Sequence, residues 1–432
     1  MNTHRALRFL TAGSVDDGKS TLIGRLLLDS SAILADQLEA LEKRAAGNAI
    51  DLSLLTDGLE AEREQGITID VAYRYFATRQ RKFIIADAPG HEQYTRNMVT
   101  AAAGSDAAVV LVDITKLDWR RTPLELLVQT RRHSLLAQLL RVPSIVFAVN
   151  KLDAVGGEAE AAFTAVRQAL REFAAQAGFE VAATVPVSAL RGDNVSLRSP
   201  HWPWYGGPTL LDALHALPAT DERHDGALLM PVQYVARHAM VQGGRGAAGH
   251  QPRTVWGRVA HGRVQAGDTV QVFPSGQTAI VDEVRRAARV VAACEAGQSA
   301  GLVLDRQLDV SRGDWIAGAA VPGGAVALAT TRQFAATLAW LDTEPARIGR
   351  MYWLRHGHRW VQARITAIDS RRDIHTLADT DAHELAVNEI GQVHIEAQMP
   401  LPLEPYATNR VSGALIVVDP ASHRTSGALL VA

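Results

Sequence analysis

Two patterns of apolar and polar residues follow each other along this chain. Over residues 1–218, apolar runs such as Leu7 to Ala12 and Ser144 to Val149 alternate with stretches of helical periodicity. The helical stretches are Ala32 to Ala46, Gln93 to Ala103, Gln129 to Leu140 and Glu158 to Ala175. Such alternation is typical of a mostly parallel sheet with helices on both faces. We therefore predict an α/β domain over residues 1–218.

The second pattern begins near Met230 and predicts β-barrels. Glycine and proline separate short apolar segments, which are Arg253 to Val259, Asp268 to Phe273, Gln277 to Val284 and Ala300 to Leu304. After a break at Val321 to Gly324 the pattern returns, in Thr337 to Leu341, Trp360 to Ile368, Gln392 to Ala397 and Ala414 to Val418. This spacing is typical of small β-barrels. We predict three domains, over residues 1–218, 226–322 and 326–432.

A phosphate-binding motif stands at the first junction of strand and helix. Residues 13–20 read Gly-Ser-Val-Asp-Asp-Gly-Lys-Ser, which matches G-x-x-x-x-G-K-S. In this setting successive backbone N–H groups point at one phosphate site. Lys19 would contact the β- and γ-phosphates, and the Ser20 hydroxyl would bind Mg²⁺. The predicted phosphate-binding residues here are Gly13, Ser14, Val15, Asp16, Asp17, Gly18, Lys19, Ser20 and Thr21.

A second motif indicates which base is bound. Asn150-Lys151-Leu152-Asp153 follows the apolar strand Ser144 to Val149. One carboxylate can accept both N–H donors on an edge of guanine, whereas adenine presents an acceptor there, so Asp153 favours guanine. Lys151 would lie over the base, and Asn150 would tie this loop to the phosphate loop. Backbone N–H groups of a third segment would face the guanine oxygen; its residues are Ser188, Ala189 and Leu190. The expected ligand is GTP.

Two further segments are predicted to sense the γ-phosphate. Asp87 follows the strand Phe83 to Ala86 and would hold Mg²⁺ through a water, while the Gly90 N–H would reach the γ-phosphate. His91 would orient the attacking water, and Thr68 would give Mg²⁺ a second hydroxyl. Losing the γ-phosphate would release both segments. The predicted catalytic residues are His91, Lys19 and Thr68, and the predicted metal ligands are Ser20, Thr68 and Asp87.

These ordered motifs resemble those of translation-factor-type GTPases, the class of elongation factor Tu. The flanking residues are more specific, and they resemble the large GTPase subunits of bacterial sulfate adenylyltransferase, the CysN family. They include VDDG at residues 15–18, where elongation factors usually have VDHG, PGHEQYTRNM at 89–98, QTRRHS at 129–134 and PWYGGPTLL at 203–211. The resemblance implies an elongation factor Tu-like architecture, in which an α/β P-loop GTPase domain precedes two small β-barrel domains.

The same resemblance implies a function. In that family, GTP hydrolysis drives the synthesis of adenosine 5′-phosphosulfate and pyrophosphate from ATP and sulfate, the first step of sulfate assimilation toward cysteine. The resemblance places adenylyl transfer on a smaller, CysD-like partner subunit in a heterodimer. Two alternatives share the GTP motifs: an elongation-factor-like GTPase that binds aminoacyl-tRNA, and a GTP-binding scaffold that hydrolyses slowly. The presence of Thr68, Asp87 and His91 argues against the scaffold.

Charge and composition limit which kinds of partner and which cellular location we expect for this protein. The net charge of −2 and pI of about 6.7 do not indicate strong capture of nucleic acid, so no nucleic-acid partner is expected. The chain has one cysteine, Cys294, which we interpret as a buried apolar residue. Neither a secretory signal nor a membrane-spanning run is evident, and the expected location is the cytoplasm.

Two segments of the chain depart from the sequence pattern of this family, and one pair of histidines could be considered as metal ligands. We interpret residues 116–128 as a tolerated surface insert and residues 242–253 as a flexible glycine-rich loop. His356 and His358 would share one face of a strand, but no third ligand is evident nearby. We therefore interpret this pair as part of a solvated turn or strand edge.

Overall fold

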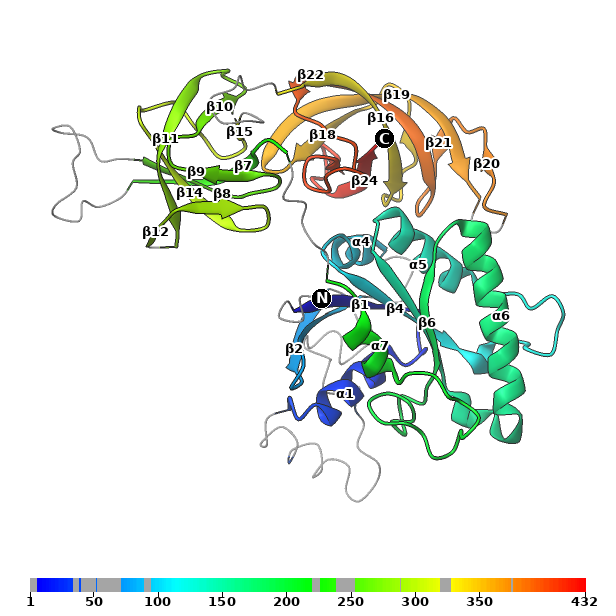
Figure 1. Ribbon diagram of the computed structural model, residues 1–432. Helices are drawn as coiled ribbons and strands as arrows, with labels where there is room; N and C mark the ends of the chain where they lie inside the picture. Colours follow the sequence, from blue (N-terminus) through cyan, green and yellow to red (C-terminus); the bar gives the residue numbers. More distant parts are fainter. Residues whose placement is uncertain are drawn as a thin grey trace. The chain divides into compact units, whose positions relative to one another are not determined.

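The structure, a computed structural model, describes residues 6–33, 39, 52, 71–88, 95–219, 226–237, 253–287, 289–318, 328–373 and 376–432. The chain forms two compact units (Figure 1). One consists of Met1–Thr220 with Asp373–Ala378, and the other of Asp221–Arg372 with Asp379–Ala432. The three domain ranges given above stay a prediction.

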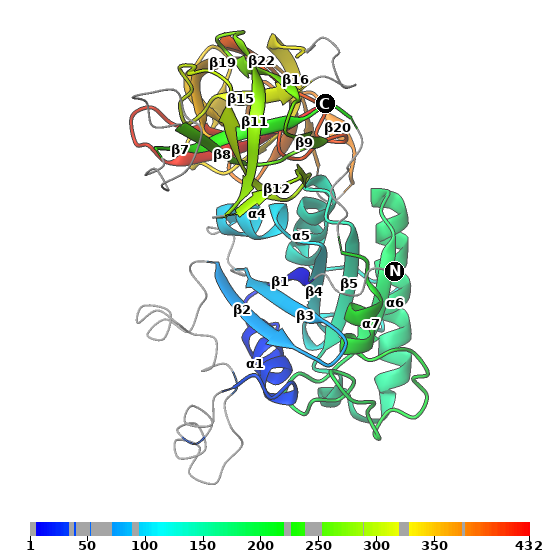
Figure 2. The same cartoon turned by 60° about the vertical axis from the view of Figure 1, so that its left-hand side comes forward.

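The first unit is built on a 6-stranded sheet with the order β2-β3-β1-β4-β5-β6. Its strands are β1 (Leu7–Ala12), β2 (Ala72–Ala77), β3 (Lys82–Asp87), β4 (Ala107–Asp113), β5 (Ser144–Asn150) and β6 (Val181–Pro186). All neighbouring pairs are parallel except β2 with β3 (Figure 2). Every residue of β4 and β5 is buried, as expected for parallel strands covered on both faces. The carboxyl ends of β1, β3, β4 and β5 therefore meet at one edge, where ligands of such sheets bind.

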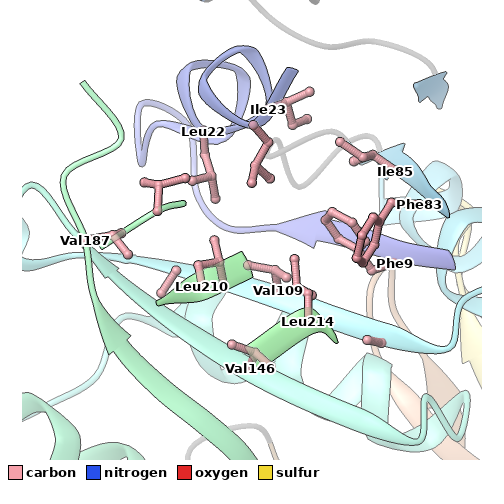
Figure 3. Packing of buried hydrophobic residues seen from close by; sticks show 14 of the residues in the cluster. Phe9, Leu22, Ile23, Phe83, Ile85, Val109, Val146, Val187, Leu210 and Leu214 are labelled. Atoms are coloured by element: carbon pink, nitrogen blue, oxygen red, sulfur yellow. The ribbon is translucent and has the colours of Figure 1, made fainter. Parts of the chain in front are cut away.

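The helices of this unit are α1 (Lys19–Asp29), α4 (Thr95–Ala103), α5 (Val128–Leu139), α6 (Ala159–Ala177) and α7 (Leu210–Ala216). Three short 3₁₀ turns accompany them: η3 (Ile114–Lys116), η4 (Leu152–Ala154) and η5 (Gly156–Glu158). Leu22 of α1 and Leu214 of α7 pack with Phe9, Val109 and Val146 of the sheet in one core (Figure 3). This packing fixes α1 on the sheet and so positions the loop that precedes it. Most of the helix expected at residues 32–46 lies outside the described residues.

Among the described residues, the second unit contains two 7-stranded antiparallel sheets and two 2-stranded ones, and the first 7-stranded sheet closes into a barrel. Its order is β10-β15-β7-β8-β14-β11-β12, and β10 also pairs with β11. The strands of this sheet are β7 (Leu229–Arg237), β8 (Arg253–Arg258), β10 (Thr269–Phe273), β11 (Thr278–Arg286), β12 (Arg289–Val291), β14 (Ser299–Leu304) and β15 (Trp315–Gly318). Two short strands, β9 (Arg263–Gln265) and β13 (Ala293–Glu295), pair with each other. Cys294 is buried in the barrel core, as predicted.

The other 7-stranded sheet closes in the same way. Its order is β18-β23-β24-β16-β22-β19-β20, and β18 also pairs with β19. The strands of this sheet are β16 (Thr331–Trp340), β18 (Met351–His356), β19 (Arg359–Arg372), β20 (Asp379–Thr380), β22 (Ile390–Leu401), β23 (Ala414–Val418) and β24 (Thr425–Val431). Two short strands, β17 (Ala346–Arg347) and β21 (Glu384–Leu385), pair with each other. The predicted fold class, an α/β domain followed by two small β-barrels, is confirmed.

The interpretation of His356 as a solvated residue was wrong. His356 ends β18, is fully buried, and stacks on Trp315 of the other barrel with ring centroids 4.6 Å apart. Its Nε2 donates to the carbonyl oxygen of Ser412 at 2.9 Å. Burial lowers the pKa of His356 to about 4.

In the described part of the chain, no group of three or more His, Cys, Asp or Glu residues is arranged to hold a metal ion. None of the helices described there has both the length and the apolar composition that a membrane span requires.

Candidate nucleotide-binding site

The phosphate loop joins β1 to α1, and Gly18 determines its shape. Gly18 precedes α1 with a φ of 92°, in the left-handed region. A Cβ added there would lie 2.4 Å from Nδ2 of Asn150. Both the backbone conformation and the available space therefore require glycine. This turn places Lys19 and Ser20 in the first turn of α1, where N–H groups point out of the helix.

Lys19 lies across the phosphate loop. Its Nζ donates to the carbonyl oxygens of Gly13 at 3.1 Å and Ser14 at 2.8 Å, and the side chain is buried. Burial lowers the pKa of Lys19, although Asp87 and Asp17 oppose that shift. A buried cation of this kind is stabilised by a nearby anion. A bound phosphate group would therefore favour the charged form of Lys19.

Asp17 and Lys116 hold the phosphate loop through side-chain contacts. The Asp17 carboxylate is fully buried, and its Oδ2 accepts the N–H of Ser14 at 2.5 Å. Its Oδ1 accepts from Nζ of Lys116 at 2.8 Å, and the same Nζ donates to the carbonyl oxygen of Val15 at 2.5 Å. Lys116 opens the segment that we interpreted as a surface insert. That interpretation was wrong for Lys116, which contacts the phosphate loop.

Asn150 joins the phosphate loop to the segment 188–190. Its Nδ2 donates to the carbonyl oxygen of Asp17 at 2.8 Å, and its Oδ1 accepts the N–H of Ala189 at 3.0 Å. Asn150 is only 2% exposed. One buried side chain thus connects three loops that are distant in sequence.

Lys151 and Asp113 form the next contact along this edge of the sheet. Nζ of Lys151 lies 2.7 Å from Oδ2 of Asp113, the last residue of β4. The other carboxylate oxygen accepts the N–H of Thr115 at 2.9 Å and its hydroxyl at 2.6 Å. Burial raises the pKa of Asp113, but the hydrogen bonds from Lys151 and Thr115 outweigh burial and lower it below its usual range. Asp113 is therefore a carboxylate that stays ionised.

Two arginines border the predicted guanine site. The Asp153 carboxylate lies 3.5 Å from Nε of Arg191 and is partly exposed. Arg25 of α1 donates to the carbonyl oxygens of Ala189 at 3.3 Å and Leu190 at 2.6 Å. These bonds hold the segment 188–190 against α1. Sequence reasoning missed Arg25, Arg191, Asp113 and Lys116, because none belongs to a motif and each contact links distant segments.

The N–H groups of the segment 188–190 are not equivalent. The N–H of Ser188 donates to the carbonyl oxygen of Asp193 at 3.1 Å, and that of Ala189 donates to Asn150. Among the described residues, no acceptor contacts the N–H of Leu190. Of the predicted donors to the guanine oxygen, Leu190 thus retains an N–H that a ligand can use.

Asp87 and Ser20 have the chemistry that Mg²⁺ prefers. Asp87 ends β3, is 1% exposed, and its Oδ1 accepts the hydroxyl of Thr11 at 3.2 Å. The charge of Asp87 opposes the lowering of the Lys19 pKa. A carboxylate and the hydroxyl of Ser20 at this edge suit a hard cation. Thr68, Gly90 and His91 lie outside the described residues, so their roles stay predictions.

Comparison with known proteins identifies the family. Residues 4–219 match the family model of the elongation factor Tu GTP binding domain, and residues 333–431 match that of the GTP-eEF1A C-terminal domain-like family. Sulfate adenylyltransferase subunit 1 of Laribacter hongkongensis is 42% identical over 99% of this chain and 85% of that protein. The chain belongs to the family of sulfate adenylyltransferase subunit 1. Its first unit is accordingly the GTP-binding domain of a member of this family.

Other relatives of the sulfate adenylyltransferase subunit 1 family are longer. The bifunctional enzyme NodQ of Azospirillum brasilense is 46% identical over 98% of this chain and 65% of that protein. The bifunctional enzyme CysN/CysC of Xylella fastidiosa is 44% identical over the same shares, 98% and 65%. The chain thus spans about two thirds of the length of these bifunctional relatives.

Proposed function

We propose that this chain is the GTPase subunit of a sulfate adenylyltransferase, in which GTP hydrolysis drives the synthesis of adenosine 5′-phosphosulfate and pyrophosphate from ATP and sulfate. The observation that carries the proposal is the buried junction at Asn150, which connects a phosphate loop, a base loop and the segment 188–190. Family membership supports the assignment to sulfate adenylyltransferase, and we infer that the reaction takes place in the cytoplasm.

The phosphates of GTP are bound by the loop that follows β1. N–H groups within the loop from Gly13 to Thr21 surround the α- and β-phosphates, and Lys19 and the N–H of Gly90 contact the γ-phosphate. The buried position of Lys19 supports this role, because an anion relieves the cost of burying its charge.

The guanine base is bound at the other half of the site. Asp153 accepts two N–H donors of guanine, and the stem of Lys151 lies over the ring. The segment of Ser188, Ala189 and Leu190 faces the guanine oxygen, and the Leu190 N–H is its available donor. Asn150 holds the base half and the phosphate half in register through its two buried hydrogen bonds.

Hydrolysis needs a positioned water and charge neutralisation. Ser20, Thr68 and, through a water, Asp87 would hold Mg²⁺, which neutralises charge on the β- and γ-phosphates when bound. His91 orients the water that attacks the γ-phosphate. Loss of the γ-phosphate then releases the segments of Thr68 and His91, so that the GTP and GDP states differ in shape.

Coupling requires that a partner distinguish these two states. Adenylyl transfer takes place on a smaller, CysD-like subunit that forms a heterodimer with this chain. The GTP and GDP states can drive an unfavourable reaction on the partner if they bind the partner with different free energies. A conformational change can transmit no more than this difference in binding free energy.

The test combines the chain with its small partner, ATP, sulfate and Mg²⁺, and measures pyrophosphate release with and without GTP. GTP should increase both the rate and the extent of release. The Lys19→Ala variant should bind no nucleotide, whereas His91→Ala should bind GTP but hydrolyse it slowly. Pyrophosphate release that is indifferent to GTP in the wild-type complex would refute the proposed coupling.

A further inference from the structure

Four charged side chains form a continuous network along the carboxyl edge of the sheet: Asp17, Lys116, Asp113 and Lys151. Nζ of Lys116 lies 2.8 Å from Oδ1 of Asp17 and 3.9 Å from Oδ2 of Asp113. That same oxygen of Asp113 lies 2.7 Å from Nζ of Lys151. The network therefore runs from the phosphate loop to the base loop.

Burial makes this network different from a surface ion pair. Both carboxylates have side chains that are 0% exposed, while the side chains of Lys116 and Lys151 are 35% and 37% exposed. A buried carboxylate that loses its cation is left uncompensated, which is costly. The pair of Arg121 and Glu125, in the same segment as Lys116, has side chains 57% and 72% exposed, and such pairs contribute little.

Lys116 contacts the phosphate loop at two points. Its Nζ donates to the carbonyl oxygen of Val15 and to the carboxylate of Asp17. Asp17 in turn accepts the N–H of Ser14. One ammonium group thus holds the carbonyl oxygen of Val15 directly and the N–H of Ser14 through the Asp17 carboxylate. These two contacts help to set the directions of the neighbouring N–H donors of the loop.

We propose that Lys116 is a positioning residue of the GTP site. It holds the phosphate loop in the conformation that binds the triphosphate, and through Asp113 it couples that conformation to Lys151 at the guanine. The proposal rests on the proposed GTP-binding function and deepens it, because it assigns a role to a residue outside the nucleotide-binding motifs.

The experiment uses the variants Lys116→Met, which keeps an unbranched side chain without the charge, and Lys116→Arg, which keeps the charge. Two quantities are measured on the full chain: the dissociation rate of a fluorescent GDP analogue, and hydrogen exchange of the amides of residues 13–19 without nucleotide. Lys116→Met should raise the dissociation rate about tenfold or more. Loss of a fully buried ion pair would have a larger effect, and the partial exposure of Lys116 reduces it. Lys116→Met should also accelerate exchange in the loop, and Lys116→Arg should restore most of both.

Two further variants separate positioning from general stability. Arg121→Met removes an exposed charge from the same segment and should leave both measurements unchanged. Adding Asp17→Asn to Lys116→Met removes the stranded carboxylate but keeps an oxygen for the Ser14 N–H. The double variant should therefore release the GDP analogue more slowly than Lys116→Met alone.

The proposal is overturned if Lys116→Met keeps the wild-type dissociation rate and loop exchange, whether or not its thermal unfolding midpoint falls. If wild-type protein binds no guanine nucleotide, the proposed function fails by itself. Hydrogen exchange in the nucleotide-free protein still decides, in that case, whether Lys116 orders the phosphate loop.

Discussion

Replacing Asn150 with alanine should separate the two halves of the nucleotide site. The side chain makes two buried hydrogen bonds, one to the carbonyl oxygen of Asp17 and one from the N–H of Ala189. Alanine leaves both backbone groups without that partner. Each unsatisfied buried group costs about 1–3 kcal/mol, so the two together cost about 2–6 kcal/mol. Water entering the vacated space would reduce this cost, and we expect a loss of about 2–4 kcal/mol in the free energy of unfolding.

The loss should also appear in nucleotide affinity. With Asn150 removed, the phosphate loop loses its direct connection to the segment 188–190 before GDP arrives, although Arg25 still holds that segment against α1. Part of the binding free energy must then order them, and every 1.4 kcal/mol so used weakens binding about tenfold. We expect Asn150→Ala to weaken GDP binding at least about tenfold by isothermal titration calorimetry, with the unfolding free energy measured in urea.

Gln138→Ala provides a matched control. The Gln138 side chain donates to the carbonyl oxygen of Ala177 at 2.6 Å and so joins α5 to the end of α6. Its loss should cost about 1 kcal/mol of stability without changing GDP affinity. If Asn150→Ala binds GDP as tightly as the wild type, or is as stable as the wild type, the assigned role of this junction is refuted.

Three further variants test other parts of the account. Asp153→Ala should abolish the preference for GTP over ITP, which lacks the exocyclic amine of guanine, in competition binding; a preference that persists would exclude Asp153 as the reader of the base. Gly18→Ala should weaken GTP binding about tenfold or more, since alanine is strained at a φ of 92°; calorimetry showing wild-type affinity would contradict this. Because the pKa of His356 falls from 6.5 to about 4 in the folded state, the unfolded state binds more protons below pH 6.5, and stability should fall by about 2 kcal/mol between pH 7 and 5. The unfolding free energy of His356→Asn, measured in urea, should lack most of that pH dependence. An unchanged dependence on pH would show that other groups cause it.

The sequence predicted those parts of the fold that depend on local pattern. The strand at Leu7–Ala12 was placed with the observed bounds, and β5 was recognised because a parallel strand buried on both faces forms a continuous apolar run. The edge strand β2 was not predicted, since its exposed Tyr73 and Tyr75 break the expected apolar pattern.

The site was predicted only as far as its motifs extend. Lys19 and Asn150 occupy motif positions, and their neighbours along the chain predict what they would bind. Lys116 and Arg25 reach the site through contacts that depend on how distant segments pack, and a single sequence carries no signal of such pairs. The burial of His356 was missed for the same reason, because Trp315, which covers it, belongs to the other barrel.

The central claim is that the first unit binds guanine nucleotides selectively, and titration calorimetry with GTP, GDP and ATP in the presence of Mg²⁺ tests it most directly. We predict saturable heat of binding for GTP and GDP at one site per chain and none for ATP at the same concentrations. Equal or tighter binding of ATP, or no binding of GTP and GDP, would contradict the account.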